Sequence, residues 1–444
     1  MNEQSNGLAI ACWKRTVNGL MGGIWLYTLA GIGLGVLSVV KMVINPGGIM
    51  SAVMSLLAML TDGEMMGGLG IFEILEYLMS FLLILGYVIF FRALFDFEKL
   101  QLNEEDSENV RKIKISYVLL VLAILAGYIP FVIIGFILKL ALLISSYVKI
   151  LSGFKGLRDS KVLPEEARRG ARLIKNANIW MLIGGIFSVV PLLGAPVNAL
   201  IEFITFFVIL AGWRRIKRGC PVLSDEDARR INEDFKPLNV KAFCWFLIAL
   251  FGYSFISYFS YLLILLLGDF PDTSKLDVFF LGNFVVASCL YIWLLCYDKM
   301  HLSPVSRMGV WAMLIMKFLD MALGYVYRCD GISLVNYTYL YYCMTFICGV
   351  GMLMLVIPTQ INKTLKTLII LYIPLNFIYE QYLTSFILFN YVDLPYDNLT
   401  LINNKHALIR NGGSTLLTTI FFILVFIFAY HEIKKDNRLY QPQQ

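Results

Sequence analysis

The sequence predicts an all-α polytopic integral membrane protein with about twelve transmembrane helices and both termini in the cytoplasm. The chain is 59% hydrophobic and only 15% charged, whereas soluble domains carry about 25% charged residues. Its apolar residues come in runs close to the ~20 residues that a helix needs to cross a ~30 Å hydrocarbon core. Alternating segments of ~10 residues, which are typical of membrane barrels, are absent, so the expected spans are helices.

Apolar runs bounded by charged and turn residues predict twelve spans. These runs cover residues 18–43, 71–94, 114–129, 131–153, 177–191, 196–213, 242–267, 277–297, 307–327, 335–357, 365–389 and 414–431. The runs at 114–129 and 177–191 hold about 15 apolar residues each, or roughly 22 Å of helix. Each forms a pair with the next run that either spans twice or re-enters from one side, so the predicted count is eight to twelve.

The distribution of lysine and arginine predicts the orientation. Most of the 37 basic residues fall at the two termini and in the even-numbered connections. Five lie on the opposite side and two inside spans: Lys41, Lys275, Arg328, Lys405 and Arg410, then Lys139 and Lys317. The positive-inside rule places both termini in the cytoplasm of a plasma or inner membrane. The first residues do not resemble a cleaved signal peptide, so the first span is expected to remain as an anchor.

An internal repeat organises residues 1–235, the first predicted domain. Residues 114–235 show one plan twice, in which a short helix, a proline turn and a longer helix lead into a basic segment. Pro130, Ile150, Leu151, Gly153 and Phe154 correspond to Pro191, Ile209, Leu210, Gly212 and Trp213. The loops match as well. In the first copy the matching residues are Val162, Leu163, Glu166, Ala167, Arg168 and Arg169, which correspond to Val222, Leu223, Glu226, Ala228, Arg229 and Arg230 in the second.

A third, weaker copy covers residues 18–112, where Glu76 precedes Gly86 by ten residues, as Glu202 precedes Gly212. The segments that begin at Asn103 and Ser224 have the pattern of capping boxes. We therefore expect three stacked helical hairpins, each followed by a short basic amphipathic helix on the anionic inner leaflet. The alternative is that these loops only determine topology.

Residues 236–444 form the second predicted domain, a bundle of six helices with an outer loop at 390–413. Residues 242–431 show no trace of the repeat, and the linker Asn232–Val240 joins the two halves. Two unlike halves argue against a carrier of the major facilitator type, which is built from similar halves.

Ionisable residues inside predicted spans are the candidate binding groups, because a charge in hydrocarbon is costly unless it faces protein or water. Lys317 and Asp320 share one helix face at a spacing of three. Span 365–389 holds Pro374, and with it the candidates Asn376, Glu380 and Gln381. Since a proline frees a backbone carbonyl, a broken helix with exposed backbone is expected there. The alternatives are a structural ion pair for the first set and a simple kink for the second.

Glu76, Lys139 and Glu202 are candidates for a structural charge network across the hairpins, although burying all three would be costly without complete hydrogen bonding. A second polar group lies on span 242–267, where hydroxyl residues share one side of the helix. These are Tyr253, Ser257, Tyr258, Ser260 and Tyr261. They line a cavity or, as the commoner role, form interhelical hydrogen bonds.

No motif for a cofactor or metal occurs. The eight cysteines form no CxxC pair, and His301, His406 and His431 are isolated. The glycines at 31, 33 and 35 follow no strand, so they do not form a nucleotide-binding turn. The net charge of +6 arises in loops between spans, which favours membrane orientation over nucleic-acid binding.

Three functions follow as hypotheses. The first is a permease-like transporter for a small or lipidic solute, with Lys317, Asp320 and Glu380 as its polar core; it predicts a water-accessible cavity joining the Lys317 helix to the Glu380 helix. The second is a non-catalytic scaffold or sensor that binds lipid headgroups or a partner membrane protein, and it predicts tight packing at the same place. The third, a membrane-embedded lipid-modifying enzyme, ranks last because paired carboxylates or a membrane-facing histidine are missing.

Overall fold

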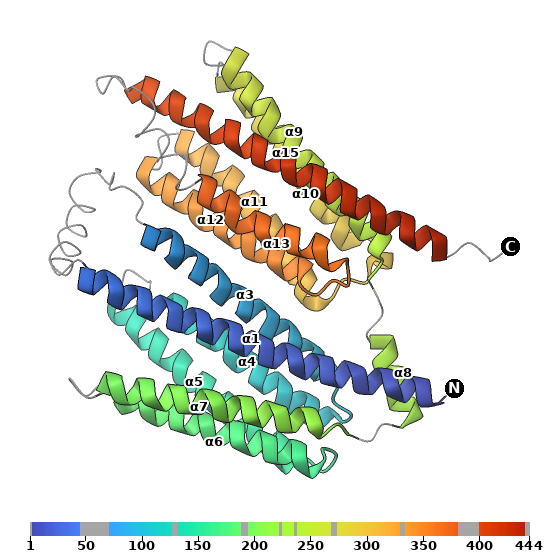
Figure 1. The fold of residues 1–444 in the computed structure, drawn as a ribbon. Helices are drawn as coiled ribbons and strands as arrows, with labels where there is room; N and C mark the ends of the chain where they lie inside the picture. The colour runs from blue at the N-terminus through green and yellow to red at the C-terminus, as the bar shows by residue number, and fades with distance from the viewer. Residues whose placement is uncertain are drawn as a thin grey trace. The chain divides into compact units, whose positions relative to one another are not determined.

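The computed structural model describes residues 2–44, 71–126, 132–187, 194–221, 224–234, 238–267, 273–328, 334–380 and 399–439. Within these ranges every regular element is a helix (Figure 1). The helices are α1 (Asn2–Ile44), α3 (Ile71–Lys99), α4 (Glu104–Ala126), α5 (Val132–Asp159), α6 (Glu165–Phe187), α7 (Gly194–Arg218), α8 (Asp225–Asp234), α9 (Val240–Leu267), α10 (Thr273–Cys296), η1 (Asp298–Met300), α11 (Pro304–Arg328), α12 (Leu334–Val356), α13 (Lys363–Ile378) and α15 (Leu399–Leu439).

Seven of the described helices are long and apolar enough to cross a bilayer. Their apolar stretches are Ala9–Ser38, Leu75–Lys99, Gly135–Asp159, Val197–Arg218, Val240–Ile264, Pro304–Val326 and Leu408–Lys435. Shorter apolar helices lie at Leu281–Cys296 and Cys343–Val356. Several long apolar helices indicate an integral membrane protein, as the composition predicts. The number of spans and the side of the termini stay predictions.

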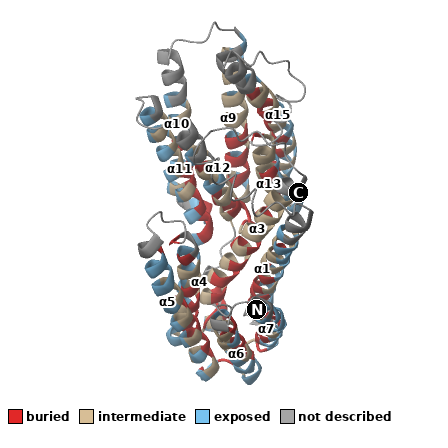
Figure 2. Ribbon diagram, turned by 90° about the vertical axis from the view of Figure 1, so that its left-hand side faces the viewer, coloured by how far each residue is buried: buried red, intermediate tan, exposed pale blue. Residues whose placement is uncertain are grey.

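Exposed residues lie on the outward faces of these helices and buried residues on their inward faces (Figure 2), and many of the exposed residues are large and apolar. Phe136 of α5 is 64% exposed and Leu416 of α15 is also 64% exposed. A soluble protein rarely exposes apolar patches of this extent, whereas lipid tails solvate them without cost. The outward faces therefore match a hydrocarbon environment.

The helices that contain the two short apolar runs are longer than those runs. α4 and α6 have 23 residues each, or about 34 Å of helix. Both begin with an acidic turn, at Glu104 in α4 and Glu165 in α6. Carboxylates there stabilise the helix, because its amino terminus carries a partial positive charge. This corrects the expectation of a short amphipathic helix after every hairpin: those segments are the first turns of α4 and α6. Only α8, with 10 residues, is separate.

Both predicted capping residues cap helices. The backbone N–H of Asp106 donates to Asn103 Oδ1 at 2.9 Å. Ser224 and Asp227 form the reciprocal box, since the Asp227 N–H donates to Ser224 Oγ at 3.1 Å and the Ser224 N–H donates to Asp227 Oδ2 at 3.4 Å. The predicted outer loop at 390–413, in contrast, is too long, because α15 already begins at Leu399.

The chain divides into two compact units. The first contains Met1–Thr28 and Leu85–Lys236, and the second contains Leu29–Ile84 and Pro237–Gln444. The division at 236/237 lies inside the linker that the sequence indicates. Residues 29–84, which the sequence groups with the first domain, cluster with the second unit.

In the first unit, glycines allow each hairpin to close tightly. A Cβ on Gly86, Gly153 or Gly212 would approach a carbonyl oxygen of the facing helix within 3.0 Å. Each Cβ would also contact the residue four positions after that carbonyl on the same facing helix. Gly86 thus faces Gly23 and Tyr27, Gly153 faces Asn109 and Ile113, and Gly212 faces Gly170 and Ile174. The three glycines are the ones aligned by the internal repeat, and small residues are what such close backbone contact requires.

The same contact recurs in the second unit, between α11 and α12. A Cβ on Gly351 would lie 2.8 Å from the carbonyl oxygen of Gly309 and 2.8 Å from Met313, four residues further on. The sequence predicts no trace of the repeat in this half. The crossing geometry is nevertheless shared, because it depends on one glycine and its register rather than on the loop motifs that define the repeat.

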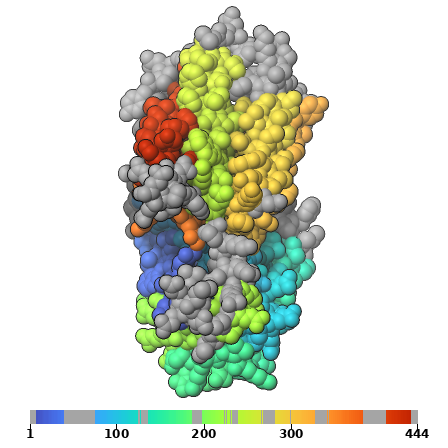
Figure 3. Space-filling view, turned by 90° about the vertical axis from the view of Figure 1, so that its right-hand side faces the viewer, coloured from blue at the N-terminus to red at the C-terminus, as the bar shows by residue number. Residues whose placement is uncertain are grey.

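The core of the second unit forms between helices distant in sequence. α9 packs along α15 and contacts α10, and Figure 3 shows α9 between these two helices on one face of the unit. At the α9–α15 contact, Gly252 faces the ring of Phe422. α13 packs against both α12 and α15, which places the helix of Glu380 inside this unit.

Candidate functional site

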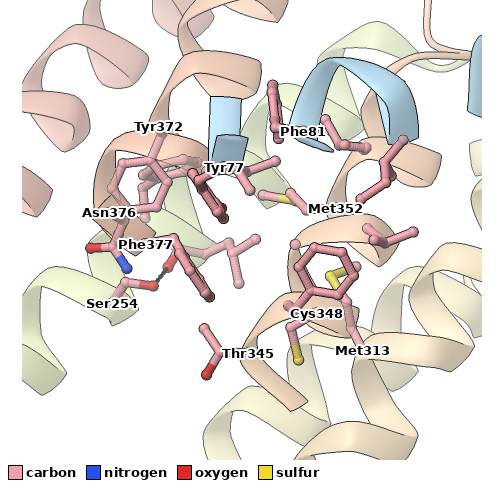
Figure 4. A pocket seen from close by; sticks show the side chains of 18 of the residues that line it. Tyr77, Phe81, Ser254, Met313, Thr345, Cys348, Met352, Tyr372, Asn376 and Phe377 are labelled. Atoms are coloured by element: carbon pink, nitrogen blue, oxygen red, sulfur yellow. Dashed lines mark hydrogen bonds between the residues drawn. The ribbon is translucent and has the colours of Figure 1, made fainter. Parts of the chain in front are cut away.

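A cavity of about 190 Å³ lies in the second unit, lined by residues of α3, α9, α10, α11, α12 and α13. Its walls are mostly apolar or aromatic, and the rings of Tyr77 and Phe377 stack with centroids 4.5 Å apart. Figure 4 shows Tyr372, Asn376 and Ser254 on one side, and Met313 and Cys348 on the other. The cavity thus has a polar side and an apolar side.

Asn376 is the pivotal residue of the polar side. Its Nδ2 donates to Glu380 Oε1 at 3.2 Å. Its Oδ1 is buried and has no hydrogen-bond partner among the described residues. A buried carbonyl oxygen without a donor costs about 1–3 kcal/mol, so this amide is prepared to accept a hydrogen bond from a molecule in the cavity.

Glu380 lies behind Asn376 and is 6% exposed. Three neutral donors from three helices converge on its Oε1: Tyr258 of α9 at 2.7 Å, Asn376 of α13 at 3.2 Å and Ser414 of α15 at 3.4 Å. No lysine or arginine pairs with this carboxyl group in the described part of the chain. Among the described residues, the carboxyl group is thus held by neutral donors, and Arg410 is within electrostatic reach of Tyr341, which also interacts with Glu380.

The helix that carries Glu380 does not break at its proline. α13 continues through the buried Pro374 to Ile378, and a wider π-type turn follows at Tyr379 and Glu380. This differs from the expected break at the proline. The extra residue in such a turn re-aims the side chains that follow, and π-turns are frequent at functional sites.

Two tyrosines hold this turn against α15. The Tyr379 hydroxyl donates to the Ile409 carbonyl at 2.6 Å, and the Tyr379 ring occupies the space beside Gly413. Tyr372 lies one turn before Asn376 on α13, and its hydroxyl is 3.1 Å from Thr418 Oγ1. The helix that leads into Glu380 is therefore held against α15 by two tyrosines.

Lys317 and Asp320 lie on α11 but do not line the cavity. They interact electrostatically with each other without forming a direct ion pair. Cys348, which does line the cavity, lies within electrostatic reach of both, and Tyr341 lies within reach of both Asp320 and Glu380. The cavity is lined by Met313 from the Lys317 helix and by Asn376 from the Glu380 helix.

The remaining candidates do not gather at this cavity. Lys139 and Glu202 are exposed in the first unit, where Glu202 accepts a hydrogen bond from Asn198 at 2.8 Å and no ion pair joins it to Lys139. Glu76 belongs to the second unit. Gln381 lies outside the described residues.

Sequence reasoning did not connect Tyr258 or Ser414 with Glu380. Tyr258 belongs to the predicted hydroxyl stripe, whose Tyr253 makes the expected interhelical bond to the Asn283 carbonyl at 2.7 Å. Ser414 lies on a polar face of α15 that also carries Asn411, Thr415 and Thr418, all of them buried. Spacings of three, four and seven residues on an otherwise apolar helix are a signal that can be read without a structure.

Comparison of the chain with protein-family models, with curated protein sequences and with solved structures finds no match. The functional argument accordingly depends on the site alone.

Proposed function

We propose that the second unit is a permease-like carrier for a small solute that has an apolar body and a hydrogen-bond-donating, cationic end. The observation that carries this proposal is the buried Glu380 carboxyl group, held by three neutral donors beside a cavity and without a salt bridge to a described lysine or arginine. A buried carboxylate is costly unless paired. A solute cation or a transported proton would complete the site.

The size of the cavity limits the solute. Its volume of about 190 Å³ is somewhat larger than the ~150 Å³ of an engineered protein cavity that accepts benzene. One aromatic ring or a short alkyl chain therefore fits between the stacked rings of Tyr77 and Phe377 and the apolar side at Met313. A larger lipid would place only part of its chain there.

The chemistry of the polar side favours a donor over an acceptor. The orphan Oδ1 of Asn376 and the carboxyl group of Glu380 both accept hydrogen bonds, so an ammonium group satisfies both. A carboxylate solute would meet two acceptors and like charge, which is unfavourable by several kcal/mol. We therefore expect selection for amines.

Three ligands of one shape test this selection: benzylamine in its protonated form, benzyl alcohol and benzoate. We expect benzylamine to bind at least about ten-fold more tightly than benzyl alcohol, since hydrogen bonds to a charged group contribute about 1.5–3 kcal/mol, and benzoate not to bind. Calorimetric titration of the purified protein measures all three. Glu380→Gln should remove the preference for the amine, whereas Glu432→Gln on α15, away from the cavity, should keep it.

Transport is tested separately in proteoliposomes on a solid-supported membrane. A rapid step in protonated benzylamine should give a transient current with the parent protein and none with Glu380→Gln. Binding without current would indicate a sensor rather than a carrier. If benzylamine, benzyl alcohol and benzoate bind equally, or none binds, the carrier proposal fails and the scaffold hypothesis takes its place.

The proposal includes the topology that the basic residues predict, with twelve spans and both termini in the cytoplasm. The crossing shared by Gly86, Gly153 and Gly212 supports three related hairpins in the first half. Reporter fusions active on only one side of the membrane, placed after residues 235 and 444, test the orientation; a signal from opposite sides would contradict it.

A further inference from the structure

A second concave site lies in the first unit, between α1 and α7. It has a volume of about 490 Å³ and is lined by Lys14 and Met21 of α1 and by Arg214, Lys217 and Arg218 of α7. Four of its five lining residues are cations. This site is separate from the cavity near Glu380 and does not depend on the carrier proposal.

None of these four cations forms an ion pair or a side-chain hydrogen bond with a residue that the structure describes. Other basic residues of the same unit do have acidic partners. The pairs are Arg92 with Asp96, Lys112 with Glu108, Lys114 with Glu98, Arg158 with Asp159, and Arg169 with Glu165. The concave site thus concentrates positive charge that the described acids of the unit leave uncompensated.

The helix dipole accounts for only part of this cluster. Arg218 and Lys217 lie in the last turn of α7, where the carboxyl end of a helix favours cations. Lys14 lies in the first third of α1, far from the carboxyl end of that helix, and yet it lines the same hollow. An anion bound between the two helices would satisfy both sets of donors.

The two helices are fixed beneath the cations, so the site is preorganised. The Trp13 indole N–H donates to the Ile216 carbonyl at 3.0 Å, and both residues are buried. The rings of Trp13 and Trp213 both pack on Phe97, with centroid distances of 5.3 and 5.6 Å. A rigid frame of this kind lowers the entropic cost of binding.

The cations lie next to a lipid-facing surface. They are near the ends of the apolar stretches Ala9–Ser38 and Val197–Arg218. About two and three turns before Arg214 on α7, Phe207 is 47% exposed and Phe203 is 56% exposed. On α1, Met21 lies between Trp13, which bonds to Ile216, and Trp25, whose ring contacts Phe206. Along the helices, Met21 is thus between the cations and the level of Phe206, in the order that a phosphate, a glycerol backbone and acyl chains would require.

We infer that this site, defined by Lys14, Met21, Arg214, Lys217 and Arg218, binds the headgroup of an anionic lipid that carries more than one phosphate charge. Four cations in one hollow exceed what a single phosphate neutralises, and basic pockets at the ends of membrane helices are the known form of such sites. The acyl chains lie along Met21 and Phe207. A free diphosphate shares the headgroup chemistry but lacks the chains.

The test compares two double variants that remove equal charge from helices of the same unit. Arg214→Gln with Arg218→Gln changes the proposed site, and Arg168→Gln with Arg172→Gln changes an exposed i,i+4 pair on α6 that does not line it. Native mass spectrometry in detergent measures binding of cardiolipin, phosphatidylglycerol, phosphatidylcholine and inorganic pyrophosphate. Parent and variants are first compared for thermal unfolding without lipid.

We expect cardiolipin to bind the parent protein more tightly than phosphatidylglycerol does, with no retained phosphatidylcholine or pyrophosphate. The Arg214/Arg218 variant should lose about 30-fold in cardiolipin affinity, on a scale of roughly five-fold for each cation near a headgroup. The Arg168/Arg172 variant should keep the parent affinity. Arg214→Lys with Arg218→Lys should keep most of the binding, which separates loss of charge from loss of fold.

Three outcomes would overturn the inference. Equal loss in both double variants would show general attraction to a charged surface rather than a site. Pyrophosphate binding as tight as that of cardiolipin would show a site for a soluble anion. Unchanged cardiolipin binding in the Arg214/Arg218 variant would place the lipid elsewhere.

Discussion

The two units use glycine and polar residues in different ways. In the first unit, glycines close each hairpin backbone to backbone, and the cations gather at one end of the helices. In the second unit, one hairpin closes in the same way, and its two helices together with α3, α9, α10 and α13 enclose a cavity with a buried carboxyl group beside it. Closely packed hairpins resist change, whereas a cavity tolerates movement of the groups around it. The contrast predicts that equivalent substitutions affect stability in one unit and function in the other.

The largest expected effect is on stability, at the first hairpin crossing. A Cβ on Gly23 would lie 2.7 Å from the Phe90 nitrogen and 2.8 Å from the Gly86 carbonyl oxygen, and these backbone atoms cannot rotate away. Gly23→Ala should therefore destabilise the protein by about 1–3 kcal/mol. Thermal unfolding in detergent measures the change.

Its matched control is the preceding residue. Gly22 has nothing within 4 Å of its Cβ position, so Gly22→Ala should be neutral or stabilising by up to about 1 kcal/mol, as alanine favours helix. Equal destabilisation by both variants would mean that the crossing is not closed at Gly23.

The next effect lies in the hydrogen bond between Tyr258 and Glu380, at 2.7 Å. Tyr258→Phe should cost about 1.5–3 kcal/mol if the acceptor is charged, and nearer 1 kcal/mol if it is neutral. Glu380→Gln keeps the shape of the side chain and removes a buried charge, so we expect stability equal to or above that of the parent. A double-mutant cycle on unfolding isolates the pair; additive effects would show that the two residues do not interact.

A third prediction concerns the turn that carries Glu380. A Cβ on Gly413 would lie 1.8 Å from the Tyr379 hydroxyl, whereas Gly412 has nothing within 4 Å. Because the Tyr379 side chain can move away by a change of its χ1 angle, whereas the backbone atoms beside Gly23 cannot, Gly413→Ala should lower stability less than Gly23→Ala does. It should, however, displace Tyr379 and weaken benzylamine binding about ten-fold, on the scale of one hydrogen bond to a charged group. Gly412→Ala should leave binding unchanged, and weakening by both would contradict the role of Tyr379.

The smallest effect is a pH dependence in the first unit. Burial raises the pKa of Asp106 above its ordinary value of 3.8, an effect that Glu105 increases and that hydrogen bonds from Ser160 and Asn103 reduce. Because the folded-state pKa is the higher one, the contribution of Asp106 to stability is present below pH 3.8 and is lost as the pH rises through the folded value. Unfolding of the parent and of Asp106→Asn should therefore diverge as the pH rises from 4 toward neutrality. A constant difference between them would contradict the raised pKa.

Several features of the fold could be read from local sequence. The caps at Asn103 and Ser224 follow from residue type and spacing, and both form in the structure. The length of α15 could not be read in this way, since the polar residues before Ser414 resemble a loop although a helix accommodates them. The start of α4 could not be read from local sequence either, because acidic residues fit the first turn of a long helix as well as that of a short one.

The candidate site was only partly accessible from the sequence. Glu380 and Asn376 stand out because polar groups are rare in an apolar span. Lys317 and Asp320 stand out for the same reason, yet they do not line the cavity. Neither the cavity nor its stacked rings has a local signal, because apolar residues that line a cavity have the same pattern as those that fill a core.

The sequence by itself determined that the chain is helical and suited to a membrane, since hydropathy, helix length and capping are properties of neighbouring residues. Only the tertiary structure decided which helices meet. Tyr258 and Glu380 are 122 positions apart, and Trp13 and Ile216 are 203 apart. The physical reason is that many glycines and small residues offer similar packing surfaces in an apolar helix. The choice among them depends on the fit of whole faces, which no local pattern records.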